Sequence, residues 1–255
     1  MIPLKDENPT TKAPVITIVL IAACVAIFVL VQPRDQGVED AEFSFKNAAI
    51  PCEVVKGRPL SSEEVRDTVE RGDQTACTSD PSSRATFPGK AVFLAVLYSM
   101  FLHGSWLHLG GNMLFLWVFG NNIEDKKGTV VYLVFYLLAG LAATAAHILV
   151  QPDSTVPVVG ASGAIAGVMG AYLVLYPNVR IRSLIFLGFL VLFRDVAAKW
   201  LLGIWVVSQF FINPNEGVAW VAHVGGFVFG VAVGLFWRAT GSPERELVFS
   251  DRPRY

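Results

Sequence analysis

The chain has 255 residues, of which 53% are hydrophobic and only 16% are charged, and its formal net charge is −1. An average soluble domain carries about 25% charged residues, so the composition argues against a soluble protein. The basic residues are not gathered into a stripe, so the sequence gives no indication of nucleic-acid binding and we expect no nucleic-acid partner.

Long uncharged runs predict a polytopic membrane protein, because roughly 20 apolar residues cross a bilayer as a helix. We expect an all-α membrane bundle of six transmembrane helices, at about 13–33, 102–123, 129–150, 159–177, 198–213 and 218–237. The first run follows a polar leader and not a short basic one. That order is typical of a retained anchor, not of a cleaved signal peptide.

The uncharged run Ser183–Phe193 is too short for a crossing. Its 11 residues would rise about 16 Å as a helix, roughly half of the hydrocarbon thickness. We therefore interpret it as an interfacial or re-entrant segment. A seventh crossing here would reverse the last span and carry His223 to the other side of the membrane.

Basic residues in the short connections predict the orientation. Lys126 and Lys127 follow the second span, Arg180, Arg182, Arg194 and Lys199 follow the fourth, and Arg238, Arg245, Arg252 and Arg254 follow the sixth. The connections 151–158 and 214–217 contain no Lys or Arg. Positive loops stay in the cytoplasm, which predicts a multi-pass protein of the cell membrane with both termini inside. The expected parts are a cytoplasmic leader at 1–12, a membrane domain at 13–238 and a cytoplasmic tail at 239–255.

The long connection 34–90 lies on the outer side in this topology. It contains "SSEEVRDTVERG", a short helix that Ser61 or Ser62 would cap. Cys52 and Cys77 both lie in this connection, and an outer location makes a disulfide between them possible. Cys24 lies within the first span, where we expect it either to face lipid or to pack between helices.

Four polar side chains fall in one layer of the predicted bundle. Spans two, four and six all begin on the outer side, and near their starts lie His108 and Asn112, Ser162, and His223. His108 and Asn112 are four residues apart and share a helix face. Each residue alone has a structural explanation, such as a serine at a helix interface or an interhelical hydrogen bond. Together they favour a functional site, because polar groups in a membrane are costly without one.

Glycines supply the close packing that such a site needs. Gly163 and Gly167 lie one turn apart on the fourth span, and Gly226, Gly230 and Gly234 repeat every four residues on the sixth. Small residues at this spacing let helix backbones approach closely. If the two faces meet, Ser162 comes within hydrogen-bonding reach of His223.

This set of residues can perform nucleophilic catalysis. His223 can take the proton of Ser162, and the Ser162 backbone N–H, Asn112 and His108 can stabilise a tetrahedral oxyanion. Spans two, three, four and six contain no Asp or Glu, so we predict a dyad and not a Ser-His-Asp triad. We expect no metal or organic cofactor, because no Cys, His and acid cluster has ligand spacing.

The combined motifs resemble those of the rhomboid intramembrane serine proteases. The matching residues are His108-x-x-x-Asn112, Gly160-Ala161-Ser162-Gly163, Ala222-His223 and Gly226-x-x-x-Gly230, within a resemblance that covers residues 13–238. It implies Ser162 as nucleophile and His223 as general base. It also implies Asn112, His108 and Gly160 on the oxyanion side, with His103 as a weaker neighbour.

The resemblance further implies hydrolysis of a peptide bond in or beside the transmembrane helix of a protein substrate. Such a substrate would come from the bilayer past the fifth span and the 212–218 loop. Small or helix-weakening residues are the expected preference near the scissile bond.

The sequence departs from the family pattern at two places. The outer loop lacks the Trp-Arg pair of many members, and Ala166 stands where some members have a tyrosine that packs on the catalytic histidine. Other neighbours must therefore position His223.

Other functions fit the sequence less well. A catalytically silent rhomboid-like binder of transmembrane partners would lack the nucleophile or the base. A transporter or channel would favour inverted repeats or intramembrane acids. A soluble G-x-S-x-G hydrolase elbow would need an α/β pattern around the serine.

Overall fold

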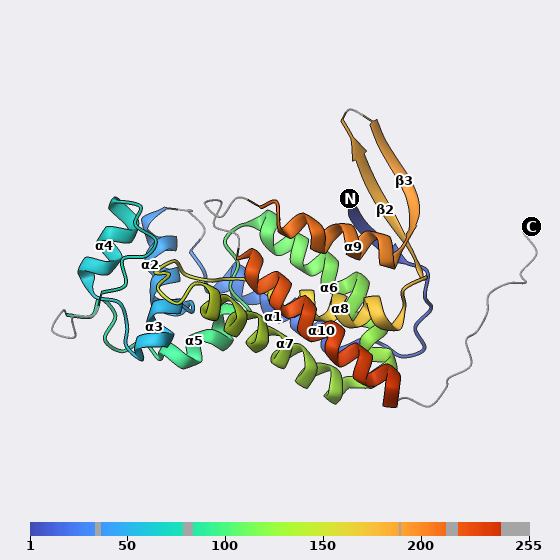
Figure 1. Cartoon of the computed structure of the whole chain (residues 1–255), viewed down its shortest axis with the longest axis horizontal. Coiled ribbons are helices and arrows are strands. Elements are labelled where there is room, and N and C mark those ends of the chain that lie inside the picture. The colour runs from blue at the N-terminus through green and yellow to red at the C-terminus, as the bar shows by residue number, and fades with distance from the viewer. Residues whose placement is uncertain (34–36, 79–83, 189, 213–218, 241–255) are drawn as a thin grey trace, which may run out of the picture.

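The computed structural model describes residues 1–33, 37–78, 84–188, 190–212 and 219–240. Figure 1 shows a helical bundle with a small lobe at one end and a β-hairpin at the other. The helices are α1 (Val15–Leu30), α2 (Val38–Asn47), α3 (Pro51–Lys56), α4 (Ser62–Glu70), α5 (Val92–Ser99), α6 (Trp106–Lys127), α7 (Thr129–Val150), α8 (Ser162–Leu175), α9 (Ala198–Gln209) and α10 (Trp220–Thr240). The strands are β1 (Ile2–Asp6), β2 (Arg180–Leu187) and β3 (Leu190–Ala197).

The bundle helices α1 and α6 to α10 fall where the sequence predicts spans, with ends that differ by a few residues. Helices α7 and α10 are each long and apolar enough to cross a bilayer, and α1 and α8 are shorter apolar helices. That the chain crosses the membrane six times therefore stays a prediction. The predicted connection 214–217 and the tail beyond residue 240 lie outside the described residues.

Helix α8 forms the centre of the bundle. Every residue from Gly163 to Tyr172 is buried, and α8 packs against α6, α7, α9 and α10. On the outer helices, by contrast, large apolar side chains face outward, including Val130, Leu149 and Val228. Exposed apolar surface of this extent is typical of a surface that contacts lipid or a partner.

The described residues of the run Ser183–Phe193 form no transmembrane helix, and its predicted interfacial or re-entrant position stays a prediction. The run forms most of a β-hairpin, in which β2 pairs antiparallel with β3 and Arg182 lies opposite Asp195. Two physical causes favour strands here: the run is rich in β-branched and aromatic residues, and Gly188 adopts a positive φ of 62° beside the turn. The expectation of an all-α fold fails in this part of the chain.

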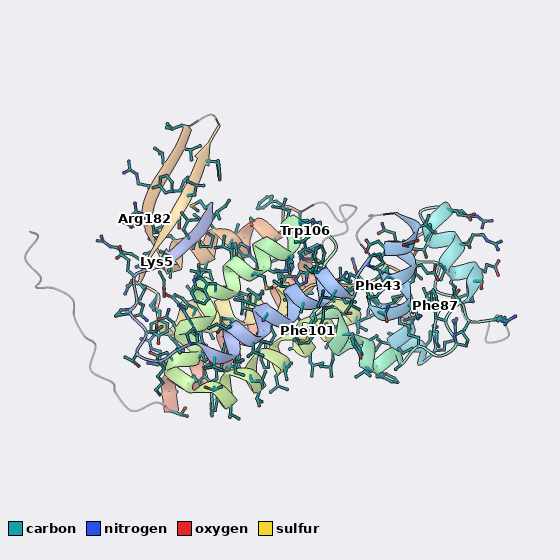
Figure 2. The ribbon with its side chains drawn as sticks, turned by 180° about the vertical axis from the view of Figure 1, so that it is seen from behind. Lys5, Phe43, Phe87, Phe101, Trp106 and Arg182 are labelled. Carbon is teal, nitrogen blue, oxygen red and sulfur yellow. A yellow bond between two sulfur atoms is a disulfide. The ribbon has the colours of Figure 1, made fainter. Side chains whose placement is uncertain are left out.

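The predicted leader is part of the same sheet. Strand β1 pairs antiparallel with β2 and places Lys5 opposite Arg182 (Figure 2). At its end, the buried Asp6 carboxylate accepts hydrogen bonds from the Tyr172 hydroxyl, at 3.0 Å, and from the Asn122 side chain. Burial raises the pKa of Asp6 to about 6. These contacts fasten residues 1–6 to α6 and α8.

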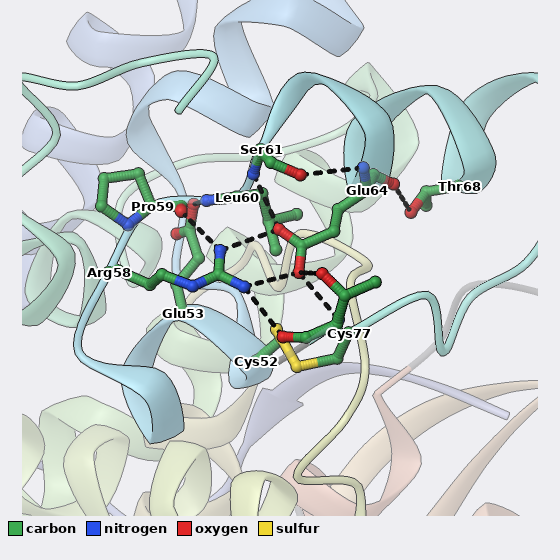
Figure 3. Close-up of polar contacts among 10 residues, drawn as sticks. Cys52, Glu53, Arg58, Pro59, Leu60, Ser61, Glu64, Thr68 and Cys77 are labelled. Atoms are coloured by element: carbon green, nitrogen blue, oxygen red, sulfur yellow. Dashed lines mark hydrogen bonds and ion pairs between the residues drawn. A yellow bond between two sulfur atoms is a disulfide. The ribbon is translucent and has the colours of Figure 1, made fainter. Parts of the chain in front are cut away.

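The lobe contains α2, α3 and α4 and lies at the opposite end of the bundle from the hairpin (Figure 1). Ser61 caps α4 in a reciprocal capping box with Glu64, as the sequence predicts. Cys52 and Cys77 form a disulfide with their Cα atoms 5.8 Å apart. Next to this disulfide, Arg58 donates two hydrogen bonds of 2.8 Å to the Glu64 carboxylate (Figure 3). Burial alone would raise the pKa of Glu64, but hydrogen bonds from Arg58, Ser61 and Thr78 lower it to about 2.

The lobe also holds the connection 151–160 that leads into α8. Backbone N–H groups of Cys52, Thr155 and Val158 donate to the carbonyls of Ser154, Gln74 and Ala49, at 2.8–2.9 Å. The lobe and the start of α8 are therefore one hydrogen-bonded unit.

Glycines bring α8 and α10 into backbone contact. A Cβ atom on Gly226 would collide with the Gly163 carbonyl, and one on Gly230 would collide with the Gly167 carbonyl. On its α7 side, α8 is equally tight, because a Cβ on Gly163 would lie 2.6 Å from the Ala143 side chain. Small residues permit this approach, in which van der Waals contact and not hydrophobicity holds membrane helices together.

This packing predicts that Gly230→Ala destabilises the protein. The added methyl group meets rigid backbone of α8, and such overpacking costs about 1–3 kcal/mol. The measurement is the free energy of unfolding in detergent micelles. The matched control is Gly203→Ala on α9, where a Cβ meets nothing within 4 Å and we expect no loss. Equal stability of the two variants would contradict the packing account.

Candidate functional site

The site begins at the first residue of α8. The Ser162 Oγ atom lies 2.8 Å from the Nε2 atom of His223, within hydrogen-bonding distance. His223 lies in the first turn of α10. The contact joins two helices whose backbones come close directly beside it, where the Gly163 carbonyl faces Gly226.

Helix α9 supplies the other neighbours of His223. The Nδ1 atom of the ring lies 2.7 Å from the Oε1 atom of Gln209, which is the last residue of α9 and is buried. The Trp205 ring lies tilted beside the imidazole, with ring centroids 6.0 Å apart. Because Ala166 replaces a tyrosine, the sequence predicted that other residues position His223, but it did not identify Gln209 or Trp205. The available signal was a polar residue inside the run predicted as the fifth span.

Asn112 and His108 lie on the α6 side of the same cavity. Asn112 is buried, and its Nδ2 atom has no hydrogen-bond partner among the described residues. A buried N–H donor is costly to leave without a hydrogen-bond acceptor. This donor is therefore available to an acceptor in the cavity.

His108 is oriented by the turn before α6. Ser105 caps the helix by accepting a hydrogen bond from the His108 backbone N–H, and the Gly104 N–H donates to His108 Nδ1 at 3.4 Å. Since Nδ1 accepts in this arrangement, the proton of the neutral ring is on Nε2. His103 lies behind His108, with ring centroids 5.2 Å apart.

Gly160 makes room for the His108 ring beside Ser162. Its φ of 125° is one that side chains rarely adopt, and a Cβ there would lie 2.8 Å from His108 Nε2 and 3.4 Å from Ser162 Oγ. The Gly160 N–H donates to the Ser99 carbonyl at 2.9 Å, which anchors this turn. A glycine at 160 thus lets an N–H donor approach the serine hydroxyl.

These groups line a cavity of about 690 Å³. Thr144 and His147 of α7 lie on its wall, and sequence reasoning gave them no role. Elsewhere in the described ranges, Cys52, Glu64 and Cys77 have the spacing of a metal site, but the two sulfurs are bonded to each other and Arg58 binds the carboxylate.

The geometry is suited to nucleophilic chemistry. A hydroxyl that donates a hydrogen bond to an imidazole can lose its proton to it as it attacks an electrophile. Free N–H donors beside it can stabilise negative charge on the attacked group.

A family model described as the rhomboid domain matches residues 90–240. The chain is 28% identical over 155 residues to "Rhomboid protein 1, mitochondrial" of Saccharomyces cerevisiae, covering 56% of this chain and 41% of that protein. It is 30% identical over 182 residues to "Presenilin-associated rhomboid-like protein, mitochondrial" of Bos taurus, covering 69% and 43%. It is 40% identical over 67 residues to "Rhomboid-like protein 11, chloroplastic" of Arabidopsis thaliana, covering 26% and 24%. The chain thus spans less than half the length of each of these relatives.

Proposed function

The chain belongs to the rhomboid family of integral membrane proteins, and from this premise we propose that it is an intramembrane serine endopeptidase. Ser162 is the nucleophile and His223 the general base of a dyad. The substrates are membrane proteins, cleaved in or beside a transmembrane segment. The observation that carries the proposal is the 2.8 Å contact between Ser162 Oγ and His223 Nε2.

The reaction proceeds by acyl transfer. His223 Nε2 takes the Ser162 proton while Oγ attacks the carbonyl carbon of the scissile bond. Asn112 Nδ2 and His108 Nε2, together with the Ser162 backbone N–H at the start of α8, donate hydrogen bonds to the oxyanion. His223 then gives its proton to the leaving nitrogen, and the C–N bond breaks. A water molecule attacks the acyl-enzyme with His223 again as base, which releases the acid and restores Ser162.

The lipid-facing bundle supports a substrate that arrives from the bilayer. A helical substrate shields its peptide carbonyls, so small or helix-weakening residues near the scissile bond favour the extended form that reaches Ser162. The described cavity is large enough to accept several residues of an extended chain, since ligand pockets of about 300–1,000 Å³ accept drug-sized molecules.

We further propose six crossings in the cell membrane, with both termini in the cytoplasm. The hairpin end carries the basic residues Lys5, Arg180 and Arg182, which suits a cytoplasmic surface. The lobe at the other end holds the Cys52–Cys77 disulfide, which suits an oxidising exterior. The relatives named for mitochondria and chloroplasts make an organelle membrane the alternative location.

A catalytically silent, substrate-binding rhomboid-like protein is the alternative function. The hydrogen bond between a serine and a histidine in the cavity gives it no support, because binding alone needs neither group.

The proposed function predicts that Ser162→Ala and His223→Ala each abolish cleavage of a model transmembrane substrate by the purified protein in lipid vesicles. Folding should persist, because both side chains border a cavity. A fluorophosphonate should label the wild type and not Ser162→Ala. The matched control is Ser62→Ala, an exposed serine of the lobe, which should cleave normally. Cleavage by purified Ser162→Ala would refute the proposal.

The oxyanion role predicts a smaller effect for Asn112→Ala. Loss of one such donor lowers kcat by about 10²–10³, because the interaction forms as negative charge develops. The measurement is kcat with the same substrate, and Asn178→Ala on the surface should match the wild type. An unchanged kcat in Asn112→Ala would remove this residue from the mechanism.

A further inference from the structure

We propose that Gln209 is a positioning residue that fixes His223 in the tautomer with its proton on Nδ1, so that the Nε2 lone pair faces Ser162. The catalytic part of this inference rests on the proposed function. The Ser-His pair then becomes part of a hydrogen-bonded chain of three side chains, from α8, α10 and α9. Its third member is a neutral carboxamide where serine proteases of the triad type have a carboxylate.

The orientation of the Gln209 carboxamide follows from its other contacts. Its Nε2 atom donates to the Trp205 backbone carbonyl at 3.1 Å and contacts Ser208 Oγ at 3.3 Å. A carbonyl oxygen accepts only, so the NH₂ end must face Trp205. The Oε1 end therefore faces His223, at 2.7 Å from Nδ1.

The orientation of the carboxamide determines the tautomer of the imidazole. Oε1 has lone pairs and no hydrogen, so Nδ1 must carry the proton in this hydrogen bond. A neutral imidazole has one N–H, which leaves Nε2 as a bare acceptor. This acceptor lies 2.8 Å from Ser162 Oγ, whose hydroxyl donates to it. The other tautomer would set two lone pairs against each other at 2.7 Å.

Burial makes this arrangement strong and explains the choice of residue. Gln209 is 5% exposed, so water does not replace Oε1 as the acceptor. A carboxylate at this position would have to be desolvated when the imidazole is neutral, which is unfavourable. A carboxamide avoids that cost and still accepts from Nδ1–H when His223 becomes an imidazolium ion. It therefore supports both protonation states of the cycle.

One turn of helix α9 carries both residues that restrain the His223 ring, Trp205 and Gln209. Trp205 lies beside the face of the imidazole, and the carbonyl of the same residue holds the Gln209 amide. Some family members pack a tyrosine on the catalytic histidine at the position of Ala166. In this chain Trp205, on a different helix, supplies the aromatic contact instead. One helical turn sets the tilt of His223 through Trp205 and its tautomer through Gln209.

The direct test is the ¹⁵N spectrum of His223 in histidine-labelled protein in nanodiscs, assigned by its loss in His223→Ala. At neutral pH the wild type should show a protonated Nδ1 and an unprotonated Nε2. Gln209→Met keeps the length of the side chain but removes the strong acceptor, and it should populate the Nε2–H tautomer. Gln209→Glu restores an acceptor and should restore the Nδ1–H form. Val207→Met, exposed on the same helix, is the control for the added methionine and should keep the wild-type spectrum.

Cleavage kinetics supply the second readout. Gln209→Met should lower kcat on the order of 10-fold, the value of one hydrogen bond, with KM unchanged, and Gln209→Glu should recover part of kcat. A wild-type spectrum with the proton on Nε2, or an unchanged tautomer and kcat in Gln209→Met, would overturn the inference. Absence of Ser162-dependent cleavage by the wild type would overturn the proposed function and the catalytic role of Gln209 with it. The tautomer would still be decided by the spectrum.

Discussion

The site depends on the distance between two helix backbones. Ser162 and His223 meet across α8 and α10 because Gly226 and Gly230 place no Cβ atoms against the Gly163 and Gly167 carbonyls of α8. A Cβ atom at Gly226 or Gly230 would collide with the α8 backbone. The packing that holds the bundle together therefore also sets the approach of Ser162 and His223.

Polar groups in an apolar bundle are costly unless they form hydrogen bonds within the protein or with a bound substrate. Most polar atoms around His223 are paired: its two ring nitrogens contact Ser162 and Gln209. By contrast, the Asn112 Nδ2 donor has no hydrogen-bond partner in the part of the chain that the structure describes. An unpaired donor next to a nucleophile is what a developing oxyanion requires. The lobe contributes at a distance, because the Val158 N–H donates to the Ala49 carbonyl just before the turn that carries Gly160.

Much of this arrangement was predictable from the sequence, for physical reasons. The alternating direction of the spans predicted that Ser162 and His223 lie near helix ends on one side, and the glycine repeats predicted which faces meet. The β-hairpin was missed because an uncharged run was compared only with the bilayer thickness, whereas its aromatic and β-branched residues together favour strands. Gln209 was missed because a lone glutamine at a helix end has no spacing signal. Its partner is 14 residues away, and only the angle between α9 and α10 brings the two together.

The most direct measurement of the central claim is an experimental structure, in a lipid nanodisc, of the protein after reaction with a fluorophosphonate. The account predicts phosphorus bonded to Ser162 Oγ, the phosphonyl oxygen within hydrogen-bonding distance of Asn112 Nδ2 and His108 Nε2, and the His223 ring still held by Gln209. Modification of another residue, or helices α8 and α10 too far apart for Ser162 and His223 to meet, would contradict it.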